Sequence, residues 1–190
     1  MSRMRSMPIS PGLRVVKSPV HGYGVVTERA FKKGELLIRS EGFIYDENAQ
    51  FDDTYALVLK TDNLTGFTGK QIFYDLVDQT RWINHSCDPN AHVEAEMDPE
   101  LGRPIAWWEA TRDIEAGEEL FYDYAFVGTV AEPCFCGAAT CRGLIVDPDP
   151  EELAQVPEKL RKHLRIPMPD STAAAAASVS APADDVRRAG

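Results

Sequence analysis

The stretch RWINHSCDPNAHV, residues 81–93, decides how the rest of this chain is interpreted. Asn84-His85-Ser86-Cys87 places an amide, an imidazole, a hydroxyl and a thiol at consecutive positions. Asp88-Pro89-Asn90 follows as a turn, because proline fixes φ and Asp and Asn bond their own backbone. Polar groups this dense are costly in a core unless each finds a partner. The stretch is therefore either a capped polar turn or part of a functional site.

Composition limits the kinds of protein to consider. The chain has 190 residues, 44% of them apolar, which suits one soluble globular domain with a small appendage. It contains no run of 18 apolar residues, and the basic residues near Met1 precede no apolar segment, so we expect neither a membrane span nor a secretory signal. A net charge of −10 disfavours direct nucleic-acid binding and favours a cationic partner. We expect a monomer in the cytoplasm, or in the nucleus of a eukaryote.

The four cysteines favour a metal site. Three of them, Cys134, Cys136 and Cys141, lie within eight residues, and the fourth is Cys87. Without an export signal disulfides are disfavoured, and one intervening residue is a poor spacing for a Cys134–Cys136 bridge. The spacing suits tetrahedral zinc, for which Cys87 is the only remaining thiolate. Free thiols and disulfides remain as alternatives. A zinc site would bring the C-terminal segment to the central motif.

Short runs of apolar alternation separated by glycine turns predict a mainly β fold. We expect strands within residues 13–19, 25–31, 36–45, 54–60 and 119–126, a strand and a short helix within 71–84, and an antiparallel pair around the loop 98–103. In the strand 119–126, alternation would put Tyr122 and Tyr124 on one face. Asp149 is the expected N-cap of a helical segment that Pro157 interrupts.

Four ordered motifs, HGYGVV, RWINHSCDPN, ATRDIEAGEELFYDYAF and CFCGAATCRGL, resemble the SET domain and post-SET segment of protein-lysine methyltransferases. The resemblance runs from about residue 13 to residue 146. It implies small curved sheets with a C-terminal pseudoknot and few short helices. The expected organisation is a flexible leader (1–12), a SET domain (13–127), a post-SET zinc segment (128–146), a short helical extension (147–166) and a disordered tail (167–190).

The resemblance also implies roles for individual residues. The catalytic set would be Tyr124, Tyr122 and the channel-lining Tyr55, and zinc would be a structural ion held by Cys87, Cys134, Cys136 and Cys141. The methyl donor S-adenosylmethionine would be held by Gly22, Tyr23, Gly24, Arg81, Asn84, His85 and Leu144. From the residues alone, Gly22 and Gly24 are a two-glycine turn or a backbone that approaches a ligand.

The expected activity is S-adenosylmethionine-dependent methylation of a lysine in a protein or basic peptide. Family experience with Tyr122 implies low methylation states. Two departures concern packing and substrate choice: Trp82 stands where phenylalanine is usual, and the stretch between Tyr45 and Gln71 is short. The alternatives are an inactive zinc-stapled module that binds a basic peptide, and a methyltransferase acting on a small amine.

Overall fold

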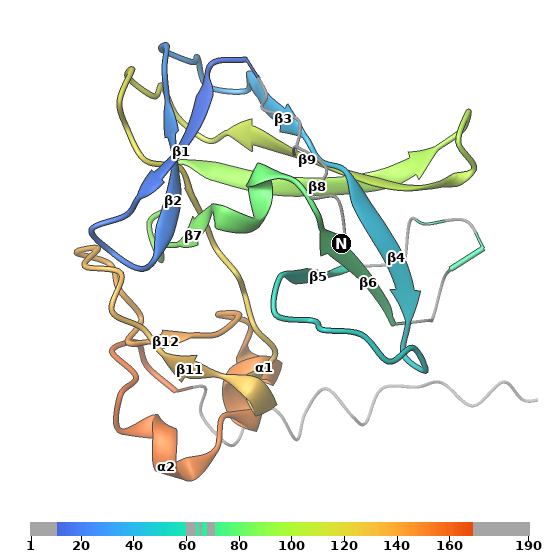
Figure 1. Ribbon diagram of the computed structural model, residues 1–190. Coiled ribbons are helices and arrows are strands. Elements are labelled where there is room, and N and C mark those ends of the chain that lie inside the picture. The colour runs from blue at the N-terminus through green and yellow to red at the C-terminus, as the bar shows by residue number, and fades with distance from the viewer. Residues whose placement is uncertain (1–10, 60–63, 65, 68–70, 169–190) are drawn as a thin grey trace, which may run out of the picture. The chain divides into compact units, whose positions relative to one another are not determined.

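The structure is a computed structural model that describes residues 11–59, 64, 66–67 and 71–168 (Figure 1). Most of the expected leader and of the expected disordered tail lies outside the described residues. The chain divides into two compact units, and the first contains residues up to Asp123 together with Cys136–Thr140. The second contains Tyr124–Phe135 and the chain from Cys141 onward. The expected boundaries at residues 127 and 146 stay a prediction.

The first unit is built from short strands. They are β1 (Leu13–Lys17), β2 (Tyr23–Thr27), β3 (Leu36–Arg39), β4 (Gly42–Asp46), β5 (Ala56–Leu59), β6 (Ile72–Leu76), β7 (Asn84–His85), β8 (Ala91–Asp98), β9 (Arg103–Ala110) and β10 (Phe121–Tyr122), with the 3₁₀ helix η1 (Gln79–Trp82) before β7. They form two-stranded sheets β1-β2 and β10-β7, and three-stranded sheets β3-β9-β8 and β4-β6-β5. The expected mainly β fold of small sheets is confirmed.

The hairpin β8–β9 shows how turn chemistry sets a register. Asp98 Oδ1 accepts hydrogen bonds from the Glu100 and Leu101 amides at 2.9 Å. Gly102 adopts a φ of +63°, which glycine tolerates without strain, and its amide bonds Asp98 O at 2.8 Å. The strands then pair antiparallel from Asp98↔Arg103 to Ala91↔Ala110. The expected strand pair around residues 98–103 is confirmed.

Strand β6 alternates strictly between buried and half-buried residues. Ile72, Tyr74 and Leu76 are buried, whereas Phe73 and Asp75 point to the other face. The Tyr74 hydroxyl donates to Ser40 O at 3.1 Å, so its burial leaves no unpaired polar group. Gly42 on β4 is needed for this packing, because a Cβ there would lie 2.3 Å from Tyr74 Cε1. The inner face of this sheet is thus close-packed.

The parallel pair β10–β7 joins distant parts of the sequence. Phe121 pairs with Asn84 and Tyr122 with His85. The strand expected over residues 119–126 is shorter than predicted, because β10 ends at Tyr122 and Ala125 has a φ of +44°. The alternation that would put Tyr122 and Tyr124 on one face therefore does not extend to Tyr124. The pairing places β10 directly beside the central motif.

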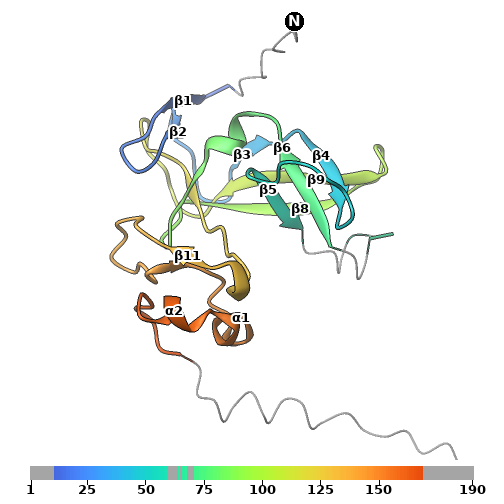
Figure 2. The same ribbon diagram turned by 60° about the horizontal axis from the view of Figure 1, so that its bottom comes forward.

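The second unit combines the cysteine-rich segment with the helical extension. It contains η2 (Gly128–Val130), β11 (Glu132–Pro133), β12 (Leu144–Ile145), α1 (Pro150–Gln155) and α2 (Glu158–Arg161) (Figure 2). Asp149 caps α1 by accepting from the Glu151 amide, and Pro157 separates α1 from α2, both as expected. The unit has one apolar core, formed by Ala131, Leu144, Val146, Leu153 and Val156. No helix in the described part of the chain is long and apolar enough to cross a membrane.

Candidate functional site

Asn84 connects three segments of the first unit. Its Nδ2 donates to Tyr23 O and to Glu119 Oε1, both at 2.9 Å, and lies 3.3 Å from His21 O. The other carboxylate oxygen of Glu119 accepts from Ser18 Oγ at 3.0 Å. The turn between β1 and β2 is thereby fixed to β7 and to the segment entering β10. Three residues expected at the site, Gly22, Tyr23 and Asn84, are brought together here.

The two glycines of the turn serve different purposes. Gly22 has a φ of +49° and open space where a Cβ would stand, so its backbone conformation is what favours glycine. At Gly24 a Cβ would lie 2.1 Å from Glu119 Oε1. The close neighbour of the Gly24 backbone is therefore a carboxylate of the same chain, and the approach to a ligand stays a prediction.

Sequence reasoning missed Glu119. It stands in the run Glu115-Ala116-Gly117-Glu118-Glu119, where the sequence indicated only a turn. Its neighbour Glu118 stabilises the turn, because its carboxylate accepts hydrogen bonds from the Glu115 amide at 2.6 Å and from the Arg112 guanidinium. Nothing in the sequence distinguishes the two acids. Only the pairing of β10 with β7 brings Glu119 to Asn84.

Arg81 and three aromatic rings form a contiguous stack. The Trp82 ring lies 5.4 Å from that of Tyr23 and 5.3 Å from that of Tyr55, measured between centroids. The Arg81 guanidinium carbon lies 4.1 Å from the centroid of Tyr55, within the range of a cation–π contact. Trp82, which stands where phenylalanine is usual, thus bridges two residues predicted for the site. The structure thus brings Tyr55, Tyr23 and Arg81 together around the Trp82 ring.

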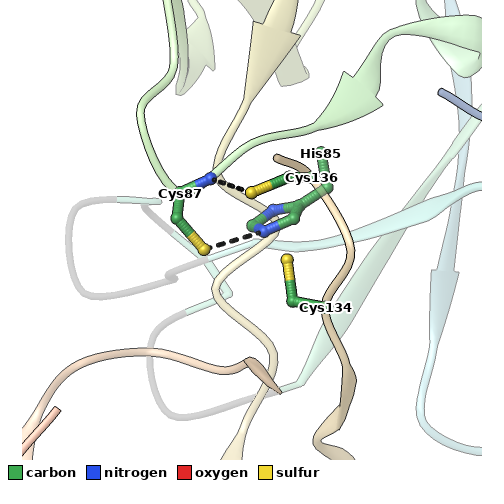
Figure 3. Close-up of side chains that lie close together, drawn as sticks. All are labelled: His85, Cys87, Cys134 and Cys136. Atoms are coloured by element: carbon green, nitrogen blue, oxygen red, sulfur yellow. Dashed lines mark hydrogen bonds between the residues drawn. The ribbon is translucent and has the colours of Figure 1, made fainter. Parts of the chain in front are cut away.

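His85 and Cys87 of the central motif offer ligand atoms of the kind that could hold a metal ion (Figure 3). The Cys87 sulfur lies 3.4 Å from His85 Nε2, and the Cys87 amide lies 3.5 Å from the Cys136 sulfur. The ligand atoms of His85, Cys87 and Cys136 all lie within 4.8 Å of one another. His85 Nδ1 is 3.6 Å from the Asp123 carboxylate. A thiol pair with an imidazole is a donor set that zinc accepts. His85, expected to bind the methyl donor, was not expected in such a group.

Tyr122 belongs to the core of the first unit. Its ring makes a T-shaped contact with the fully buried Trp108, at 5.8 Å between centroids and an interplanar angle of 86°. It is 8% exposed, so the packing of β9 fixes its orientation. A residue held in this way changes position little when a ligand arrives.

Tyr124, Cys134, Cys141 and Leu144 belong to the second unit. The Tyr124 ring lies 5.8 Å from that of Phe126. The Cys134 amide bonds Gly143 O at 3.0 Å, and the Cys141 sulfur accepts from the Gly143 amide at 3.4 Å. Leu144 is fully buried in the apolar core of this unit. The roles expected for these four residues stay predictions.

Comparison with known proteins identifies related sequences. The family model described as the SET domain matches residues 22–125, more than half of the chain. The putative histone-lysine N-methyltransferase ASHH4 of Arabidopsis thaliana is 34% identical over 139 residues, which are 68% of this chain and 38% of that protein. The histone-lysine N-methyltransferase Set2 of Drosophila melanogaster is 31% identical over 155 residues, 77% of this chain and 7% of that protein. The chain thus spans well under half of these relatives.

A solved structure resembles the fold. A crystal structure of KRYPTONITE in complex with mCHH DNA, an H3(1-15) peptide and SAH is similar with a TM-score of 0.57 and 22% sequence identity. The similarity covers 70% of this chain and 29% of that one. At this identity the comparison supports the arrangement of strands and carries no conclusion about ligands.

Proposed function

Since this chain belongs to the SET-domain family, we propose that it is an S-adenosylmethionine-dependent protein-lysine N-methyltransferase. The family match over residues 22–125 is the observation that carries the proposal. The named relatives act on histones, so the proposed substrates are lysines in histones or similarly basic proteins. A net charge of −10 suits such a substrate. Proteins of this kind are met in the nucleus and the cytoplasm, where we place the enzyme.

The surroundings of Asn84 suit the amino acid part of the methyl donor. The side-chain amide has two hydrogens, but it faces three acceptors: His21 O, Tyr23 O and Glu119 Oε1. This excess of acceptors matches the ammonium group of the methyl donor's amino acid part, which only donates hydrogen bonds. Bound S-adenosylmethionine would supply a methyl group on a positively charged sulfur. The residues proposed to hold it are Gly22, Tyr23, Gly24, Arg81, Asn84, His85 and Leu144.

The protein must orient a lysine amine and keep it neutral. With a usual pKa of about 10.4, only about one lysine in a few thousand is neutral at pH 7. Burial among aromatic rings and nearby positive charge both lower that pKa, so no dedicated base is needed. In this proposal Tyr55 lines the lysine channel, with the Arg81 guanidinium 4.1 Å from its ring. Tyr124 acts as a hydrogen-bonding group that orients the amine.

Tyr122 is proposed to limit the number of methyl groups, because a phenol can hold a water where a methylated nitrogen would stand. We expect Tyr122→Phe to shift the product from monomethyl lysine toward dimethyl and trimethyl lysine. The edge contact with Trp108 needs only the ring, which phenylalanine keeps. Mass spectrometry of the peptide product measures the distribution at matched turnover. A wild-type product dominated by trimethyl lysine would contradict the prediction.

Zinc is proposed as a structural ion held by Cys87, Cys134, Cys136 and Cys141. Four thiolates leave no open position for water, so the ion would have no catalytic part. Ligand atoms on tetrahedral zinc lie about 3.6–3.8 Å apart, and the 3.4 Å between Cys87 Sγ and His85 Nε2 shows comparable crowding in the first unit. The competing assignment has His85 as a ligand beside Cys87 and Cys136 and does not include Cys141.

Metal analysis separates the two ligand sets. Cys136 belongs to both, so we expect Cys136→Ser to lose bound zinc and to increase thiol reactivity of the remaining cysteines. Cys141→Ser should lose zinc only if the four-cysteine set is right. The measurements are zinc per chain by elemental mass spectrometry and thiol titration in the native state. Retention of one zinc per chain in Cys136→Ser would refute the site. We also expect chelation to loosen the C-terminal segment and remove methyl transfer, and full methyl transfer after verified chelation would contradict this.

Labelled cofactor tests the function itself. The chain is incubated with S-adenosylmethionine carrying a labelled methyl group and with histones, other basic proteins or small amines. Label on a protein lysine supports the proposal. Cofactor binding without transfer to any acceptor would instead favour an inactive peptide-binding module. Label recovered only in small amines would favour a methyltransferase that acts on small amines.

A further inference from the structure

The sheet β4-β6-β5 has a second face that the core does not use. Alternation on β6 sends Phe73 and Asp75 to this side, away from the buried Tyr74. Cross-strand partners share a face, and the register aligns neighbours on β4 and β5 with these two residues. The residues so aligned are Phe43 and Ala56 beside Asp75, and Tyr45 and Val58 beside Phe73. We call these six residues, together with Phe51, the aromatic–acidic face.

Two of its apolar side chains are exposed, and three of its rings contact one another. Phe43 is 60% exposed and Val58 is 55% exposed. The Phe51 ring stacks on Tyr45 at 4.1 Å between centroids and meets Phe73 edge-on at 5.5 Å. Contiguous exposed apolar groups of this kind mark interaction surfaces. Because the rings hold one another in place, a partner would not need to order them.

The surroundings of this face are acidic. Residues 41–79 contain eight acidic residues and two lysines, and both lysines lie outside the described residues. Asp46 ends β4, and Glu47, Asp52 and Asp53 lie in the segment between β4 and β5; all four are exposed. Burial raises the pKa of Asp75, although Arg81 opposes the effect. A further cation above Asp75 would therefore be stabilising.

We propose that the aromatic–acidic face binds an arginine- or lysine-rich segment of the protein substrate, separate from the lysine that is methylated. Guanidinium and ammonium groups stack on aromatic rings and are attracted by the acidic border. The same border repels nucleic acids and anionic lipids, and two copies of the face would repel each other. The choice of a substrate segment as the partner rests on the proposed function. The sheet β4-β6-β5 would then increase substrate affinity without contributing a catalytic residue.

The binding test uses the full chain and a fluorescent arginine-rich peptide without lysine, so that it does not depend on catalysis. Phe43→Ser removes an exposed ring and should weaken binding about three- to tenfold. Val58→Thr replaces an exposed apolar side chain by a polar one of the same shape and should weaken binding less. Leu101→Ser is the matched control, because Leu101 is 59% exposed at the tip of the β8–β9 hairpin, outside the face. Asp52→Asn with Asp53→Asn should weaken binding most at low salt. Equal affinity of Phe43→Ser and the parent would overturn the proposal.

A kinetic test links the face to the substrate. For a long basic protein, Phe43→Ser should raise KM about three- to tenfold and leave kcat unchanged, whereas a short peptide around the methylated lysine should show no change. Equal KM changes for both substrates would overturn the proposal. Peptide binding that depends on Phe43 in a chain without methyl transfer would support the face and count against the proposed function. Sedimentation of the parent as a dimer that Phe43→Ser dissociates would show an interface between copies and overturn the proposal.

Discussion

Replacing Tyr124 by phenylalanine is expected to lower kcat for methyl transfer about 10²- to 10³-fold, with little change in cofactor affinity. The substitution removes one hydroxyl, which the proposal uses to orient the lysine amine. The aromatic ring stays, and with it the contact to Phe126 at 5.8 Å. Losing a positioned polar group in the transition state reduces kcat and kcat/KM together. Single-turnover rates with a short peptide, together with calorimetric binding of the cofactor, separate the two effects.

Tyr45→Phe is the matched control for this prediction. It also removes one hydroxyl and keeps a ring, here the ring stacked on Phe51, but Tyr45 lies on the aromatic–acidic face. Its single-turnover rate with a short peptide should equal that of the parent. If Tyr124→Phe retained kcat within about twofold of the parent, Tyr124 would not be the residue that orients the amine.

The strands could be predicted where local chemistry determines them. Asp98 and Gly102 define the β8–β9 turn, and the alternation of β6 is visible in the order of its residues. Asp149 and Pro157 likewise determine the ends of short helices. The strand over residues 119–126 was predicted too long, because alternating residues carry no information about the positive φ at Ala125.

The sequence indicates candidate residues for the site but not the contacts between them. The central motif and the glycine turn could be selected by residue type, yet the carboxylate that joins them, Glu119, could not. Its contact with Asn84 depends on a parallel pair of only two residues on each strand, β7 and β10. Pairing this short leaves no periodic pattern. The proximity of His85 to Cys136 could not be predicted either, because 51 positions separate them in the chain.

The core of the second unit was also missed. The expected organisation separates a zinc segment, 128–146, from a helical extension, 147–166, and the sequence gives no sign that the two share a core. In the structure Leu144 and Val146 share one core with Leu153 and Val156. Apolar packing therefore contributes to this segment's stability in addition to any metal. The backbone contact that closes the unit is made at Gly143, and it leads to the second prediction.

Gly143→Ala is expected to destabilise the second unit by about 2–5 kcal/mol. Gly143 has a φ of +80°, and a Cβ there would lie 1.8 Å from His163 O. The left-handed backbone costs about 1–2 kcal/mol in a residue with a Cβ. The contact adds about 1–3 kcal/mol, because the chain around His163 must move. That movement would break the hydrogen bond from the Arg165 amide to Arg142 O, which measures 2.8 Å.

Gly137→Ala is the matched control, because Gly137 has nearly the same φ, +76°, and nothing within 4 Å of its Cβ position. All three tryptophans, Trp82, Trp107 and Trp108, lie in the first unit, so their fluorescence reports on that unit alone. Amide hydrogen exchange at Leu153 and Arg165 reports on the second unit. In Gly143→Ala these amides should exchange at least about 30-fold faster while the fluorescence midpoint in urea is kept. Gly137 lies in the Cys136–Thr140 segment of the first unit, so Gly137→Ala should leave exchange at Leu153 and Arg165 unchanged. Equal exchange in the two alanine variants would contradict the prediction.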